Sequence, residues 1–112
     1  MKIIIGKYPF TVTLYDNATS VALKSLLPLT VEMTELNGNR KYADLSASLP
    51  EDSSVPELIH AGDVMLFGTS TLVLFYKTFS TTYSYTQIGR IHEIADLADA
   101  VGSGDIIASY EL

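Results

Sequence analysis

The tract from Thr78 to Thr86 has the residue types best suited to contact with a partner. Its nine residues carry no charge and include six serines and threonines and three aromatic residues, Phe79, Tyr83 and Tyr85. Ring faces can contact a peptide or an apolar ligand, and hydroxyl groups can donate hydrogen bonds to carbonyls. The tract therefore predicts one wall of a binding groove. An ordinary exposed strand would have the same composition, and its edge could pair with a second copy of the chain.

No other set of residues dictates a reaction. His60 and His92 are too few for a typical histidine metal site unless Asp63 or Glu93 joins them. A Ser-His-Asp arrangement stays open because its members meet only in space. However, the chain contains neither a Gly-x-Ser-x-Gly nor a phosphate-binding Gly-x-x-x-x-Gly-Lys motif. We therefore expect no metal and no cofactor, and we interpret both histidines as structural or surface residues.

Composition narrows the class of protein. The 112 residues are 47% hydrophobic and 18% charged, which is typical of a single globular domain over residues 1–112. The net charge is −6, and basic residues do not cluster beyond Arg40-Lys41, so nucleic acid binding is not expected. The absence of cysteine excludes disulfides and thiolate sites, and packing must supply the stability.

The first residues bear on cellular location. The apolar run Met1–Ile5 stops at Gly6 and is too short for a signal peptide or a membrane span. We therefore expect a cytoplasmic protein without membrane partners. A chain that begins after a removed signal peptide would look the same.

The first half of the chain predicts strands around one helix. Apolar residues alternate in the strands and recur at helical spacing in the helix, which Asp16 or Asn17 can cap and Pro28 ends. The run Asn37-Gly38-Asn39 predicts a tight turn. The expected elements are strands over Lys2–Ile5, Phe10–Leu14, Leu29–Thr34 and Arg40–Leu45 and a helix over Ala18–Leu27.

The second half predicts a long loop, a central hairpin, a helix and a last strand. The expected elements are an irregular stretch over Ser46–Leu58, strands over Val64–Phe67 and Thr71–Tyr76, a helix over Ile94–Val101 and a strand over Ile106–Tyr110. Gly102 is expected to end the helix. About eight strands with two short helices and no βαβ rhythm predict a mainly β fold. We expect an antiparallel barrel, closed or nearly closed, with helices at its ends.

Five short motifs, taken in order, are similar to landmarks of a known family. They are Leu14-Tyr15-Asp16-Asn17, Leu36-Asn37-Gly38-Asn39, Ala61-Gly62-Asp63-Val64, Leu74-Phe75-Tyr76 and Ile88-Gly89-Arg90-Ile91. The chain resembles the cyclophilin-like proteins of bacteria and archaea, small β-barrels related to the cyclophilin prolyl isomerases. The resemblance covers most of the chain and implies a cyclophilin-like barrel.

The sequence departs from the isomerases at their catalytic groups. A glutamine-glycine pair precedes their Gly-Asp, whereas His60-Ala61 precedes Gly62-Asp63. Their upstream Phe-His-Arg, whose arginine hydrogen bonds the proline nitrogen, has no counterpart, and Lys41-Tyr42-Ala43-Asp44-Leu45 offers an acid instead. The pair Phe75-Tyr76 resembles their paired phenylalanines, one of which forms the floor of the proline pocket. The resemblance implies a pocket without the usual catalytic group.

We therefore expect the chain to bind a peptide or protein segment, with or without a proline, or else a small apolar ligand. The predicted ligand-binding residues are Phe75, Tyr76, Phe79, Tyr83, Tyr85 and Arg90. The first alternative is weak peptidyl-prolyl cis-trans isomerase activity, with Arg40 or Arg90 reaching the groove and Arg90 as the candidate catalyst. The second alternative is assembly into a homodimer or larger homo-oligomer through the same tract.

Overall fold

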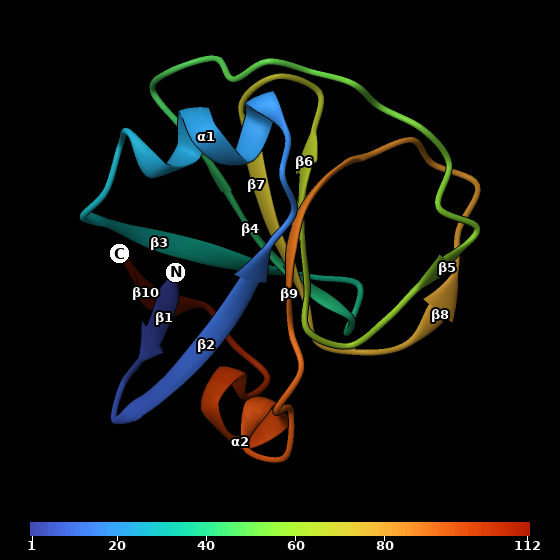
Figure 1. The fold of residues 1–112 in the computed structure, drawn as a ribbon. Coiled ribbons are helices and arrows are strands. Elements are labelled where there is room, and N and C mark those ends of the chain that lie inside the picture. The colour runs from blue at the N-terminus through green and yellow to red at the C-terminus, as the bar shows by residue number, and fades with distance from the viewer.

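Eight antiparallel strands close into a barrel, in the order β1-β10-β3-β4-β7-β6-β9-β2. The computed structural model describes residues 1–112. The barrel strands are β1 (Lys2–Ile5), β2 (Tyr8–Leu14), β3 (Leu29–Leu36), β4 (Arg40–Asp44), β6 (Asp63–Phe67), β7 (Thr71–Phe75), β9 (Thr86–Ile91) and β10 (Ile106–Glu111). Two short strands, β5 (Leu58–Ile59) and β8 (Phe79–Ser80), form a separate ribbon beside the barrel (Figure 1). The closed antiparallel barrel confirms the predicted fold.

The barrel interior is filled by every second residue of its strands, as the alternation of strand side chains requires. The two helices, α1 (Ala18–Lys24) and α2 (Leu97–Val101), lie at opposite ends of the barrel (Figure 1). Leu23 of α1 and Leu97 and Val101 of α2 are buried in the same core as the inward-facing strand residues. The helices therefore close the two ends of the barrel.

Both helices are shorter than the sequence predicted. The first was expected over Ala18–Leu27 and ends at Lys24, because the backbone N–H groups of Leu26 and Leu27 bond three residues back rather than four. The second was expected over Ile94–Val101 and begins at Leu97, after a turn closed by another such bond. Asn17 caps the first helix, as predicted, by accepting a hydrogen bond from a backbone N–H. Neither helix is long and apolar enough to cross a membrane.

A second, smaller core lies outside the barrel. Its buried members, called here the outer cluster, are Ile59, Met65, Val73, Phe75 and Tyr85. They come from the outward faces of β6 and β7 and from the segments that form or follow the β5–β8 ribbon. Strand β7 is thus buried on both faces, which explains why its sequence is apolar almost throughout.

Two glycines in the motifs that resemble the family allow close contact between strands. Gly62 has φ +97°, and a Cβ there would overlap the carbonyl oxygen of Ile91 on β9. A Cβ at Gly89 would lie 2.6 Å from the carbonyl oxygen of Thr13 on β2. Glycine at these two positions therefore lets β6, β9 and β2 approach closely where the barrel closes.

Candidate functional site

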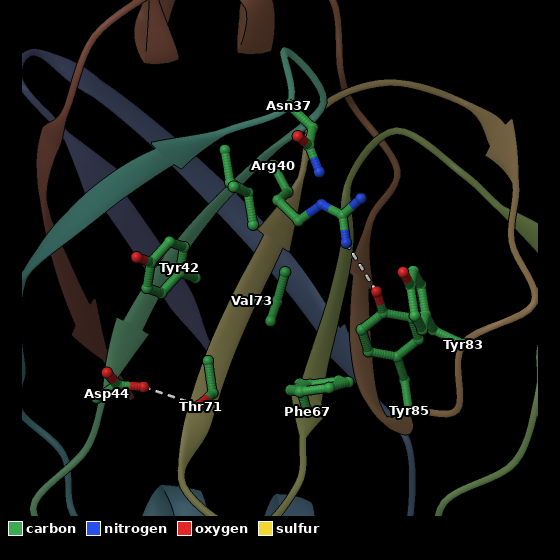
Figure 2. Close-up of a pocket in the computed structure, with 10 residues that line it drawn as sticks. Asn37, Arg40, Tyr42, Asp44, Phe67, Thr71, Val73, Tyr83 and Tyr85 are labelled. Atoms are coloured by element: carbon green, nitrogen blue, oxygen red, sulfur yellow. Dashed lines mark hydrogen bonds between the residues drawn. The ribbon is translucent and has the colours of Figure 1, made fainter.

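A cavity of about 420 Å³ lies on the outer face of the barrel (Figure 2). Its floor consists of outward-facing residues at alternate positions of two paired strands, Arg40, Tyr42 and Asp44 of β4 and Thr71 and Val73 of β7. Its far wall comes from the end of the aromatic tract, as the segment Thr78–Thr86 is called here. We refer to this cavity as the groove. Its volume falls in the range of small-ligand and peptide-residue pockets.

The middle of the groove is apolar and aromatic. Val73 at its floor and Tyr85 in its wall are buried, whereas Phe67 and Tyr83 stand at the rim with 48% and 61% of their surface exposed. The rings of Phe67 and Tyr85 pack at a centroid distance of 5.7 Å with a tilt of 56°. Large exposed aromatic side chains that gather beside a cavity are typical of a binding surface.

Arg40 holds its guanidinium at one end of the groove. The guanidinium carbon lies 5.4 Å from the ring centre of Phe75 and 5.5 Å from that of Phe79. Its Nε donates to Asn39 Oδ1 at 2.7 Å, and its Nη1 donates to Tyr85 Oη at 2.8 Å, the bond drawn in Figure 2. Since arginine has five N–H donors, three remain for a ligand. The stacked rings and the two bonds fix the direction in which these donors point.

Tyr85 presents a neutral phenol beside this arginine. Burial raises the pKa of Tyr85, and the nearby Arg40 only partly opposes that rise. Because the phenol oxygen accepts a hydrogen bond from Arg40, its own O–H is left to donate elsewhere. The arginine and the phenol together form a donor pair suited to a carbonyl or carboxylate oxygen.

The opposite end of the groove is acidic. The side chain of Asp44 is exposed, and its Oδ1 accepts a hydrogen bond of 2.8 Å from the hydroxyl of Thr71 (Figure 2). No ion pair of the chain includes either Asp44 or Arg40. The groove therefore has one unpaired charge of each sign, with an apolar stretch between them.

The structure brings part of the predicted residue set together. Tyr83 and Tyr85 line the groove, and Phe79 lines a neighbouring hollow of about 350 Å³ that shares Arg40 and Tyr83 with it. Phe75 is fully buried beneath the arginine and supports the site without facing the cavity. Within the aromatic tract only β8 and the first residue of β9 are strand, so most of it is irregular chain rather than an exposed strand.

Tyr76 lies on the other side of the sheet. Successive strand residues point to opposite faces, so Phe75 and Tyr76 cannot both face one groove. The Tyr76 hydroxyl donates to Glu35, whose Oε1 also accepts a hydrogen bond of 3.1 Å from the fully buried Lys41. Burial and the bond to Glu35 raise the pKa of Tyr76 to about 12. These contacts fasten the end of the barrel near α2, where Lys41 also donates to the carbonyl of Gly102.

Arg90 also lies away from the groove. Its Nε donates to Asp63 Oδ1 at 2.6 Å, and its Nη2 lies 3.0 Å from His60 Nδ1. Asp63 is 1% exposed and faces Arg90 across the pairing of β6 with β9. The hydrogen bond to Asp63 raises the pKa of Arg90 further. Arg90 compensates the buried carboxylate of Asp63. The motifs that contain Gly62-Asp63 and Gly89-Arg90 are thus joined by this pair in the structure.

Sequence reasoning missed the residues of β4 as a group. Arg40, Tyr42 and Asp44 form the outward face of a strand whose inward residues, Lys41 and Ala43, are buried. The alternation of side chains along the strand could have identified this outward face. The lysine among the inward residues hid it, because a charged residue is not expected to be buried. Nowhere in the structure do three or more His, Asp or Glu side chains gather to form a metal site.

Comparison with known proteins adds one finding. The family model described as the cyclophilin-like family matches residues 3–111, which is nearly the whole chain. No curated protein and no solved structure matches the chain. The family match confirms the resemblance that the five sequence motifs suggested.

Proposed function

We propose that this chain, which belongs to the cyclophilin-like family, binds an extended peptide segment in the groove over β4 and β7. The observation that carries the proposal is the placement of Arg40. A guanidinium held over two aromatic rings, beside an apolar cavity and without an acidic partner, is organised to donate to a ligand.

Each part of the groove has a role in this proposal. The apolar middle, around Val73 and Phe67, receives an apolar side chain or a proline ring. The spare N–H groups of Arg40 and the hydroxyl of Tyr85 donate to a backbone carbonyl of the peptide. Tyr83 stands at the rim with most of its ring exposed and covers part of the bound segment.

The direct test is a titration of isotope-labelled protein with proline-containing and proline-free peptides, followed by the shift changes of backbone amides. We expect the largest changes at β4, β7 and the aromatic tract. Changes confined to any other surface would refute the proposal. Saturation by small apolar compounds but by no peptide would assign the groove to a small ligand instead.

Light scattering across a range of protein concentrations tests the competing use of this surface. A mass that stays at one chain supports a groove free for a peptide. A mass that doubles with concentration, and returns to one chain in a Tyr83→Ser variant, would identify the exposed rim as a homodimer interface.

Prolyl isomerisation is the second candidate, and the same arginine favours it. The barrier to X-Pro rotation is about 20 kcal/mol, and lowering it requires an apolar pocket and a donor aimed at the proline nitrogen. Val73 and Phe67 supply apolar surface, and Arg40 supplies the donor from an adjacent position. The sequence still lacks the glutamine of the isomerases, so we expect slow turnover.

A protease-free isomerisation assay on several X-Pro peptides decides between binding alone and catalysis. If the chain is an isomerase, Arg40→Ala lowers kcat/KM by roughly a hundredfold or more, as loss of an oriented donor does elsewhere. Arg40→Lys is the matched variant, since it keeps the charge but loses the planar fork. A measurable rate that survives Arg40→Ala but falls in a folded Arg90→Lys variant would move the catalytic group to Arg90.

A further inference from the structure

The two ends of the groove carry opposite charges that the chain itself leaves unpaired. Arg40 and Asp44 both face outward from β4, and four residue steps along the strand place their Cα atoms about 13 Å apart. Two charge pairs elsewhere in the chain, Asp63 with Arg90 and Glu35 with Lys41, each join a buried charged group to a partner. Arg40 is half-buried and has no such partner, and Asp44 is exposed and also unpaired.

Both charged groups are positioned, and both keep hydrogen-bonding capacity. Arg40 is fixed by two aromatic rings and two hydrogen bonds, with three N–H donors left over. Asp44 is oriented by the hydroxyl of Thr71 on the neighbouring strand, which contacts only one of its two carboxylate oxygens. An acceptor can meet the first group and a donor can meet the second.

The surface between these ends is apolar. Tyr42 and Val73 form the floor there, and Phe67 and Tyr83 rise from the rim. A segment that lies along β4 thus meets a positive group, an apolar surface and a negative group in succession. The distance of about 13 Å corresponds to two residues about four positions apart in an extended peptide.

We infer that the groove selects a peptide segment of mixed charge, with a carboxylate at the Arg40 end, an apolar middle and a cation about four residues away at the Asp44 end. This inference rests on the proposed function and adds the ligand class. The chain has a net charge of −6, which disfavours ligands of net negative charge. Opposite charges at both ends also fix the direction in which the segment lies.

Binding of four capped pentapeptides tests the inference: Lys-Ala-Phe-Pro-Glu, Gln-Ala-Phe-Pro-Gln, Glu-Ala-Phe-Pro-Glu and Lys-Ala-Phe-Pro-Lys. At low ionic strength the mixed peptide should bind roughly three- to tenfold more tightly than the neutral one, and salt should narrow the gap. Equal affinity of all four would overturn the inference and leave the proposed function in place. Failure of all four to bind would count against both.

A charge reversal shows whether Asp44 makes the selection. In Asp44→Lys the preference should move from the mixed peptide to Glu-Ala-Phe-Pro-Glu. Glu93→Lys is the matched control, because it changes the net charge equally at an exposed position outside the groove and should keep the original preference. The same change of preference in both variants would overturn the inference, since overall charge would then explain it.

A further peptide, Lys-Ala-Phe-Pro-Ala with a free terminal carboxylate, identifies the source of the negative group. Binding as tight as that of the capped peptide that ends in Glu supports recognition of a chain terminus as well as of an acidic side chain. Tenfold weaker binding assigns the Arg40 end to side-chain carboxylates. Binding of both forms at the level of the neutral peptide would overturn the role of Arg40 in the inference.

Discussion

The two arginines on the outer surface of the barrel have the same side chain and opposite uses. Arg90 is bonded to the buried carboxylate of Asp63 and lies beside His60. Arg40 has no acidic partner and rests on the rings of Phe75 and Phe79. An arginine that compensates a buried acid contributes to the fold, whereas an arginine supported by ring faces keeps its charge and donors available. The comparison predicts that substitutions at these positions separate stability from binding.

The largest expected effect is on stability, at Arg90. Arg90→Ala leaves the 1% exposed Asp63 without its cation and should lower the free energy of unfolding by about 3–5 kcal/mol. Urea unfolding measures the loss. Lys24→Ala, at an exposed site on α1, is the control and should change stability by less than about 0.5 kcal/mol. A loss at Arg90 no larger than the control would break the comparison.

The next effect is on affinity, at Arg40. Arg40→Ala removes the charged donor of the groove and should weaken peptide binding by roughly 10- to 100-fold, as loss of hydrogen bonds to a charged group does. Stability should fall by only about 1–2 kcal/mol, the worth of the stacking and of two hydrogen bonds that water can partly replace. Calorimetric titration and urea unfolding of one preparation test both parts. A folded variant with unchanged affinity would contradict the role given to Arg40.

A smaller effect is expected from the hydroxyl that orients this arginine. Tyr85→Phe keeps the buried ring but removes the acceptor for Arg40 Nη1. We expect binding to weaken by roughly two- to tenfold, with little change in stability because the half-buried Arg40 keeps contact with water. Tyr83→Phe is the matched variant, since it removes a hydroxyl at the rim. Equal losses in both would show that orientation of Arg40 is unimportant.

The smallest expected effect is on the pH dependence of stability, through Glu35, which is paired with Lys41. Burial acts to raise the pKa of Glu35, but hydrogen bonds from Tyr76, Gly38 and Lys41 outweigh it and lower that pKa below its ordinary 4.5. A carboxyl group whose pKa is lower in the folded chain stabilises it above pH 4.5 and loses that contribution as the pH falls further. The midpoint temperature of unfolding should therefore fall more between pH 6 and pH 3 in the wild-type protein than in Glu35→Gln. Parallel curves would contradict this.

The barrel was predictable from sequence because its patterns are local. Alternating apolar residues mark the strands, and Asn37-Gly38 and Gly68 mark hairpin turns, where the structure shows positive φ. The helix ends were less predictable, since the bonding pattern of α1 tightens at Leu26, before Pro28 is reached. Apolar periodicity does not reveal how far a short helix extends.

The site was predictable only in part, because it depends on which face of a strand meets which loop. The composition of the aromatic tract pointed to Tyr83 and Tyr85, and both line the groove. No local pattern shows which of Arg40 and Arg90 pairs with an acid, since neither has an acidic residue within two positions along the chain. Only the register of β6 with β9 places Asp63 opposite Arg90, and pairing between strands distant in sequence is not encoded in any short motif.

Closure of the barrel has a consequence for contacts between molecules. Every barrel strand has a neighbour on both sides, so its backbone offers no row of free N–H and C=O groups to another chain. The only strands with an open edge are β5 and β8, which are two residues long and pair only with each other. Intermolecular β-pairing can therefore begin only at this ribbon, and two residues provide too short a template for sheet growth. The eight-stranded framework is thus protected from edge-to-edge aggregation, while side chains beside the ribbon remain free for recognition.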